Sequence, residues 1–214
     1  MFAWLGWANR LGGVIAKEDD FEVTSSFMRL LLYGSRSFSR TVHELALDCG
    51  HEVAGSIDDF YVGPTILGTL ESVATSHPPQ EFGLVMAVGY SDLRGRWGAW
   101  TKAKSLGYEA PSLIHPRAYV ARSAVLQPGT MVMAGAIVDV RAVVGELSVL
   151  WPGVCVNHDV VIGSNCFVAP NATICGNASV GRSSFVGAGA AVADHCAIPE
   201  NSFIKMLTRN FVKS

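Results

Sequence analysis

The sequence of 214 residues is 50% hydrophobic and 16% charged, which excludes a disordered chain and a coiled coil. This length is enough for one or two domains with a buried core. The formal net charge is −2 and the Lys and Arg residues are scattered, so no basic face for nucleic acid is expected. The absence of an apolar run of about 18 residues argues against a membrane span. The absence of a basic region before the first apolar residues argues against a signal peptide.

The cysteines are odd in number and form no C-x-x-C pair, which argues against a zinc site and a disulfide scaffold. We therefore expect no bound metal. The pattern fits a protein of the reducing cytoplasm in which cysteines are small buried hydrophobic residues. The five are Cys49, Cys155, Cys166, Cys175 and Cys196.

The N-terminal half begins with residues 1–27, an extension of unclear role that matches no element. A short apolar strand is expected at residues 28–33, ending in a turn at Gly34 and Ser35. An amphipathic helix follows through residues 42–47, and a second strand at residues 52–57 ends at Asp58. This order of strand, glycine turn, helix, strand and acid is the outline of a nucleotide-binding βαβ unit.

The glycine fingerprint of dinucleotide-binding proteins is missing, because the turn from Gly34 to Ser39 contains one glycine. The turn is compatible with one sugar nucleotide, with Asp58 on the base or ribose. The alternative, a capped strand end that binds nothing, stays open at this point. A third strand is expected at residues 84–88, and a helix at residues 92–105 is stopped by Gly107.

From Ile114 onward an aliphatic residue recurs at every sixth position for 15 hexads. The fifth position of each hexad is small or β-branched, and the fourth is mostly Gly, Asn, Asp or Ser, which tolerate left-handed backbone at corners. Six residues make one short strand and one corner, and three such edges close a triangular coil. The pattern therefore predicts about five stacked coils and excludes an ordinary sandwich. The aliphatic residues are Ile114, Val120, Leu126, Val132, Val138, Val144, Leu150, Val156, Ile162, Val168, Ile174, Val180, Val186, Val192 and Ile198, and Ile204 extends the series.

This hexad pattern resembles the hexapeptide-repeat proteins, which form a left-handed parallel β-helix. The left hand is taken from the resemblance, because the usual crossover rule would give the opposite hand.

His158 and Asp159 place an imidazole next to a carboxylate at one predicted corner. An imidazole is the most common general base, and a neighbouring acid can hold its tautomer and raise its basicity. A solvated corner histidine without a role is the competing interpretation, and the spacing alone does not decide between the two.

The stretch from Met28 to about Ile204 resembles the NeuD/PglD-type sugar acyltransferases. These combine a small Rossmann-like domain with a left-handed β-helix and move an acetyl group from acetyl-CoA to an amino or hydroxyl group of a sugar. The residues that carry the resemblance are Gly34, Asp58, Ala87-Val88-Gly89 with Arg94, Ile114-His115-Pro116, Gly153, and Asn157-His158-Asp159 before Val161-Ile162-Gly163.

The resemblance implies a division into residues 28–113, a Rossmann-like domain for a sugar nucleotide, and residues 114–204, the acyltransferase β-helix, followed by a tail at residues 205–214. It implies that His158 is the catalytic base and Asp159 its acidic partner. Acetyl-CoA would run along Gly187, Ala188 and Gly189, whose smallness lets it approach the backbone. Gly187 is a second-position residue with no inward role, so we do not expect the core to require its small size. The implied substrate-binding residues are Gly34, Ser35, Asp58, Gly89, Arg94 and Asn157.

The resemblance also implies a cytoplasmic homotrimer that acts in surface-glycan biosynthesis. We expect Trp151, Phe167 and Phe185 to point outward, where a partner subunit would cover them.

The chain departs from the family pattern at several places. It has Ser37-Phe38 where relatives have Gly-His, Trp151 in place of an Asn, Phe167 in place of a second His, and no Gly-x-Pro-Ala-Lys tail after Ile204. Three alternatives therefore stay open: O-acetylation of sialic acid or a polysaccharide, a non-catalytic assembly protein, and a zinc hydratase. The zinc hydratase is the weakest, because His115, His158 and His195 occupy different hexad positions.

Overall fold

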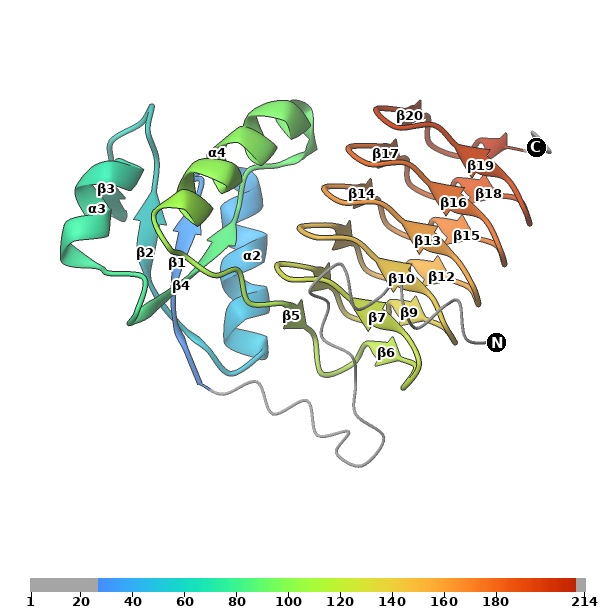
Figure 1. The fold of residues 1–214 in the computed structure, drawn as a ribbon, viewed down its shortest axis with the longest axis horizontal. Coiled ribbons are helices and arrows are strands. Elements are labelled where there is room, and N and C mark those ends of the chain that lie inside the picture. Colours follow the sequence, from blue (N-terminus) through green and yellow to red (C-terminus); the bar gives the residue numbers. More distant parts are fainter. Residues whose placement is uncertain (1–26, 211–214) are drawn as a thin grey trace. The chain divides into compact units, whose positions relative to one another are not determined.

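The computed structural model describes residues 27–210, which divide into two units, residues 27–116 and residues 117–210 (Figure 1). Among the described residues, no helix combines the length and the apolar character that crossing a membrane requires. All five cysteines are free thiols.

The first unit is built on a parallel four-stranded sheet in the order β3-β2-β1-β4. Residues Leu30, Leu31 and Leu32 of the central strand are all buried, as expected for a strand whose two faces are both covered. The strands are β1 (Arg29–Tyr33), β2 (Glu52–Ile57), β3 (Ile66–Gly68) and β4 (Phe82–Met86).

Two helices of this unit begin at residues whose side chains cap them. The Thr69 side chain accepts a hydrogen bond from the Ser72 N–H, and the Asp92 side chain accepts one from the Gly95 N–H at 2.7 Å. The elements are α2 (Ser37–Asp48), α3 (Leu70–Ser76), the 3₁₀ helix η1 (Tyr90–Asp92), α4 (Leu93–Ser105) and the short strand β5 (Leu113–Ile114).

The α/β fold expected for this half is confirmed, with two omissions and one shift. The third predicted strand lies two residues earlier than expected, at Phe82–Met86. The sequence analysis did not predict β3 or α3, which lie between β2 and β4. Both are short, and β3 follows Gly63 and Pro64, two residue types that predict a loop.

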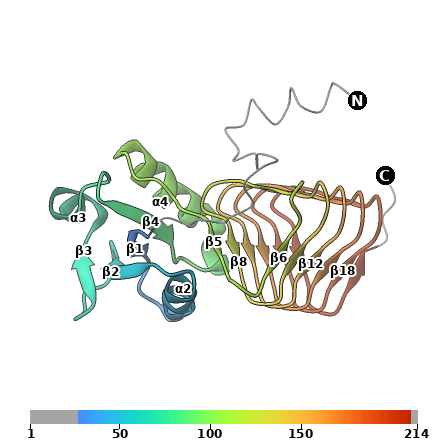
Figure 2. The ribbon, with the colours of Figure 1, turned by 90° about the horizontal axis from the view of Figure 1, so that it is seen from below.

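The second unit is the predicted left-handed parallel β-helix, in which each hexad contributes a strand of two residues (Figures 1 and 2). Its strands are β6 (Tyr119–Val120), β7 (Val125–Leu126), β8 (Met131–Val132), β9 (Ile137–Val138), β10 (Val143–Val144), β11 (Val149–Leu150), β12 (Cys155–Val156), β13 (Val161–Ile162), β14 (Phe167–Val168), β15 (Thr173–Ile174), β16 (Ser179–Val180), β17 (Phe185–Val186), β18 (Ala191–Val192), β19 (Ala197–Ile198), β20 (Phe203–Ile204) and β21 (Arg209–Asn210).

Strands three hexads apart pair in parallel, so every residue lies over the residue 18 positions earlier. Val144 pairs with Leu126 before it and with Ile162 after it, and the same register holds on the other two faces of the prism. The aliphatic residues of the first hexad position form the core, and all of them from Val132 to Val192 are buried. This burial is the main stabilising contribution to the unit.

The corners lie where the hexad pattern predicted them. Every fourth-position residue from Gly129 to Leu207 has a positive φ between 53° and 72°. Gly, Asn, Asp and Ser adopt this conformation at modest cost. Arg141 and Leu147 also adopt it here, although their side chains disfavour it. Closure of the coil therefore overrides the local preference of these side chains.

The aromatic residues differ in part from the expectation. Phe167 is only 1% exposed and its ring lies 6.1 Å from that of Trp151, so Phe167 needs no partner to cover it. Phe185 stacks on Phe203 at 4.8 Å, and Phe203, which was not singled out, is 66% exposed.

Gly187 has a structural role that the sequence analysis did not give it. We expected the small size of this second-position residue to be unnecessary for the fold, and this was wrong. A Cβ atom at Gly187 would lie 2.4 Å from the Met206 nitrogen and 2.8 Å from the Ile204 oxygen, both backbone atoms of the next coil. Gly145, Gly163 and Gly181 are constrained in the same way.

We therefore expect Gly187→Val to reduce the free energy of unfolding by about 3 kcal/mol or more, because backbone atoms of the neighbouring coil cannot move aside. Ala197→Val, which also introduces a valine but at an exposed strand position, is the control and should change stability little. Urea unfolding followed by circular dichroism measures both. Equal stability of the two variants would show that the coils tolerate a side chain at Gly187.

Candidate functional site

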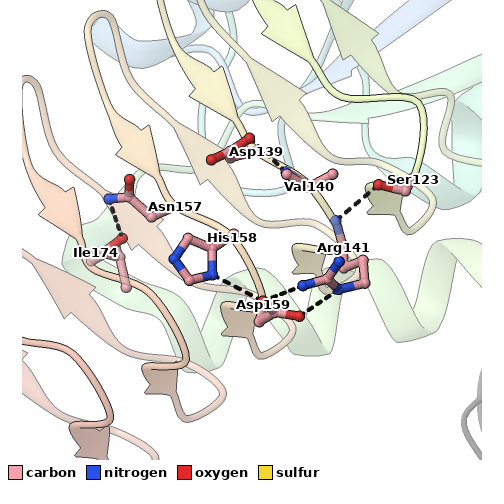
Figure 3. Close-up of polar contacts among 8 residues, drawn as sticks. All are labelled: Ser123, Asp139, Val140, Arg141, Asn157, His158, Asp159 and Ile174. Carbon is pink, nitrogen blue, oxygen red and sulfur yellow. Dashed lines mark hydrogen bonds and ion pairs between the residues drawn. The ribbon is translucent and has the colours of Figure 1, made fainter. Parts of the chain in front are cut away.

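His158 and Asp159 occupy the corner between β12 and β13. Asp159 is the fourth-position residue with φ of 60°, and His158 precedes it with a side chain that is 51% exposed. The corner conformation turns the backbone so that both side chains project from the same edge of the prism (Figure 3).

The imidazole and the carboxylate are in direct contact, as the sequence analysis expected. His158 Nδ1 lies 2.9 Å from Asp159 Oδ2 (Figure 3). With the proton on Nδ1, the ring donates to the carboxylate and its Nε2 is left as a proton acceptor. This is the arrangement that a histidine general base requires.

Arg141, which the sequence analysis missed, completes this cluster from the preceding coil. Its Nε donates to Asp159 Oδ1 at 2.6 Å and its Nη2 donates to Asp159 Oδ2 at 2.7 Å (Figure 3). These hydrogen bonds, and then that from His158, lower the pKa of the Asp159 carboxyl to about 2. Arg141 lies 18 residues, or one coil, before Asp159. The repeat in the sequence therefore already indicated that these two residues are stacked.

Gly176, in the following coil, makes room for the imidazole. A Cβ atom there would lie 2.6 Å from Cε1 and 2.7 Å from Nε2 of His158. The ring therefore lies across a residue that has no side chain. Gly176 lies 18 residues after His158. The repeat therefore also indicated that Gly176 stacks on His158, but the sequence analysis did not single it out.

Asn157 is bonded to the backbone of the next coil. Its Nδ2 donates to the Ile174 carbonyl oxygen at 3.0 Å (Figure 3). The amide thus stabilises the coil stacking beside His158, and its contact with a substrate stays a prediction.

In the first unit, Gly34, Ser35, Asp58 and Gly89 all follow the carboxyl ends of strands. Strands β1 and β4 are neighbours while β2 and β3 extend to the other side of β1, so these strand ends lie at the topological switch point of the sheet. Ligands of open α/β sheets bind at such points. Arg94 lies exposed in the first turn of α4.

Asp58 has an internal role in the structure. It is 8% exposed, Ser35 Oγ donates to its Oδ2 at 2.5 Å, and the N–H groups of Phe60 and Tyr61 donate to its Oδ1 at 3.0 and 3.1 Å. Burial raises the pKa of this carboxyl, but these hydrogen bonds lower it more, so the net pKa lies below its usual value. Asp58 therefore holds the loop after β2 to the turn after β1, and a contact with base or ribose stays a prediction.

Gly34 is required by the backbone. Its φ is +118°, and a Cβ atom would lie 2.9 Å from the carbonyl carbon and oxygen of Ala87. The turn after β1 thus passes directly against the end of β4.

Gly187, Ala188 and Gly189 lie at a different corner of the prism from His158. They connect β17 to β18, whereas His158 connects β12 to β13. Gly189 is an exposed corner residue with φ of 63°. Within one chain, the structure does not bring the residues expected for acetyl-CoA next to the residues expected for catalysis.

The described part of the chain contains no group of three His, Cys, Asp or Glu side chains placed to hold a metal ion. His115 Nε2 instead lies 3.2 Å from Asp48 Oδ2 within the first unit. His195 is the fourth-position residue two coils beyond Asp159.

Comparison with known proteins places these observations in context. The family model described as bacterial transferase hexapeptide, six repeats, matches residues 141–176. This span begins at Arg141, ends at Gly176 and contains the whole cluster around His158. A search of curated proteins finds no match.

Solved structures match over most of the chain. The acetyltransferase domain of PglB from Neisseria gonorrhoeae has a TM-score of 0.80 and 26% identity, covering 86% of this chain and 92% of that one. A His-to-Ala mutant of GDP-perosamine N-acetyltransferase from Caulobacter crescentus, in complex with CoA and GDP-perosamine, has a TM-score of 0.79 and 26% identity over 86% and 89%. The PglB domain in complex with acetyl coenzyme A has a TM-score of 0.71 and 26% identity over 83% and 95%.

We predict that Gly176→Ala moves the His158 ring away from Asp159 and leaves the fold almost as stable as before. The added methyl group meets the end of an exposed side chain, which can rotate away at little cost. NMR of the imidazole nitrogens reports the ring contact, and thermal unfolding reports stability. Cys175→Ala is the neighbouring control, and unchanged His158 signals in Gly176→Ala would contradict the steric argument.

Proposed function

We propose that this chain, a hexapeptide-repeat acyltransferase similar to the NeuD/PglD-type sugar acetyltransferases, transfers the acetyl group of acetyl-CoA to an amino group of a nucleotide-linked amino sugar. The observation that carries the proposal is the contact between His158 Nδ1 and Asp159 Oδ2 at an exposed corner. This contact lies inside the span that matches the transferase repeat family. The structural neighbours are acetyltransferases, with structures that contain acetyl-CoA or CoA.

In the proposed reaction, the amine nitrogen of the acceptor attacks the thioester carbonyl carbon while His158 Nε2 removes a proton from that amine. The C–S bond then breaks, and CoA leaves as a thiol after taking up a proton. Asp159 accepts the Nδ1 proton in a hydrogen bond, which holds the ring and stabilises the imidazolium. A backbone N–H of a neighbouring subunit would bind the oxyanion.

The first unit is proposed to bind the nucleotide part of the acceptor. The strand ends that carry Gly34, Ser35 and Gly89 form the switch point of its sheet, and Asp58 orders the loop beside them. One neighbour was solved with GDP-perosamine, a nucleotide-linked sugar. We infer a substrate of this class for the present chain, in a cytoplasmic step of surface-glycan synthesis.

A homotrimer would resolve the separation of the two proposed subsites. Gly187–Gly189 and His158 lie at different corners of one prism. If both line one active site, a second copy must supply one of them. Parallel prisms packed around a three-fold axis bring different corners of neighbouring subunits together.

The experiment is an assay of CoA thiol release from acetyl-CoA with UDP-, GDP- and dTDP-linked amino sugars as acceptors. We expect His158→Ala to lower kcat by about 10²–10⁴-fold with an unchanged melting temperature, because it removes the general base from an exposed position. Asp159→Asn should cost less, because it affects orientation and not the base itself.

His195→Asn is the matched control, since it changes an exposed histidine at the same corner and Asn tolerates its φ of 59°. Wild-type turnover in His158→Ala would remove this residue from the mechanism. Release of CoA only with hydroxyl acceptors would identify an O-acetyltransferase, and no release together with no acetyl-CoA binding would favour a non-catalytic assembly protein.

A further inference from the structure

The Asp159 carboxylate contacts both His158 and Arg141, and a His–Asp pair does not require the arginine. Oδ1 accepts from Arg141 Nε, while Oδ2 accepts from Arg141 Nη2 and also contacts His158 Nδ1. We propose that Arg141 is a positioning residue of the acetyl-transfer site, which fixes the plane of the Asp159 carboxylate and offsets its charge next to His158. This inference rests on the function proposed above.

The orienting effect follows from the geometry of the guanidinium. An exposed contact between one carboxylate and one imidazole is weak, because both side chains rotate and water competes. A guanidinium that donates through two nitrogens fixes both oxygens of the carboxylate at once. Arg141 Nε lies 2.6 Å from Asp159 Oδ1, and Arg141 Nη2 lies 2.7 Å from Asp159 Oδ2. These two contacts fix the direction in which Oδ2 faces His158 Nδ1.

Arg141 is itself held by the repeat. Its backbone N–H donates to Ser123 Oγ at 3.1 Å, and its φ of 58° belongs to the corner (Figure 3). Ser123, Arg141 and Asp159 are spaced by 18 residues and stack at one corner. The orientation of His158 therefore derives from three stacked coils and not from a loop, and such rigid support is what a catalytic group requires.

The charge of Arg141 has a separate effect. Hydrogen bonds from Arg141, and then the one from His158, lower the pKa of the Asp159 carboxyl to about 2. Asp159 is therefore ionised at neutral pH and acts as a hydrogen-bond acceptor for His158 Nδ1.

Other titratable groups lie near this corner. Asp139 lies in the preceding coil and accepts a hydrogen bond from its own neighbour, the Val140 N–H, at 2.7 Å. Cys155 lies on the strand before His158, Cys175 in the next coil, and Asp194 and His195 one coil further. None of them is placed between Arg141 and Asp159.

The test compares kcat and KM of Arg141→Gln, Arg141→Lys and wild type. Arg141→Gln should lower kcat about 10-fold or more at unchanged KM for acetyl-CoA, since a group that orients the base contributes only part of its effect.

Arg141→Lys keeps the positive charge but cannot donate to both carboxylate oxygens through a planar guanidinium, so kcat should stay low. Arg122→Gln is the matched control. It removes an exposed arginine two coils before His158 at the same corner and should alter neither quantity. A wild-type kcat in Arg141→Gln overturns the proposal.

A second measurement separates this inference from the proposed function. ¹⁵N NMR of the imidazoles, with His158→Gln to assign the signal, reports the tautomer without any substrate. The wild type should show the proton on Nδ1, and Arg141→Gln should show a mixture of tautomers. If wild type transfers no acetyl group, the proposed function fails, while identical tautomers in wild type and Arg141→Gln would overturn the role of Arg141.

Discussion

Each residue of the β-helix lies over the residue 18 positions earlier, and the rest of the molecule's proposed chemistry depends on this register. The register follows from three hexads per coil, each closed by a fourth-position residue of positive φ. Because the corners recur at a fixed interval, side chains far apart in the sequence are stacked into columns. One such column contains Ser123, Arg141 and Asp159, and the column beside it contains His158 and Gly176.

Because of this register, glycines in this fold have two distinct structural roles. At Gly187 the neighbouring coil presents backbone atoms, so a side chain would disturb the stacking itself. At Gly176 the neighbour is the exposed ring of His158, which can move, so a side chain would affect the ring and not the fold. A glycine in a β-helix can be interpreted only after the atoms 18 residues away are known.

Much of the fold could be predicted from the sequence because the hexad pattern repeats without a gap, and each repeat confirms the others. The aliphatic core from Val132 to Val192 and the corner positions both followed from it. The first unit was harder, since β3 and α3 are short and have no repeat to support them. At the site, the His158–Asp159 contact was predicted from adjacency, while Arg141 and Gly176 were missed because the 18-residue period was not applied to side chains.

The proposed acetyl transfer requires the thioester of acetyl-CoA to reach the corner that carries His158, next to Gly187–Gly189 of a neighbouring subunit. NMR of the histidine side chains during titration of the wild-type protein with acetyl-CoA detects this approach. We predict that the His158 signals shift saturably, while those of His43 in the first unit stay in place. No shift of His158 at millimolar acetyl-CoA would contradict the assignment of this corner as the acetyl-transfer site.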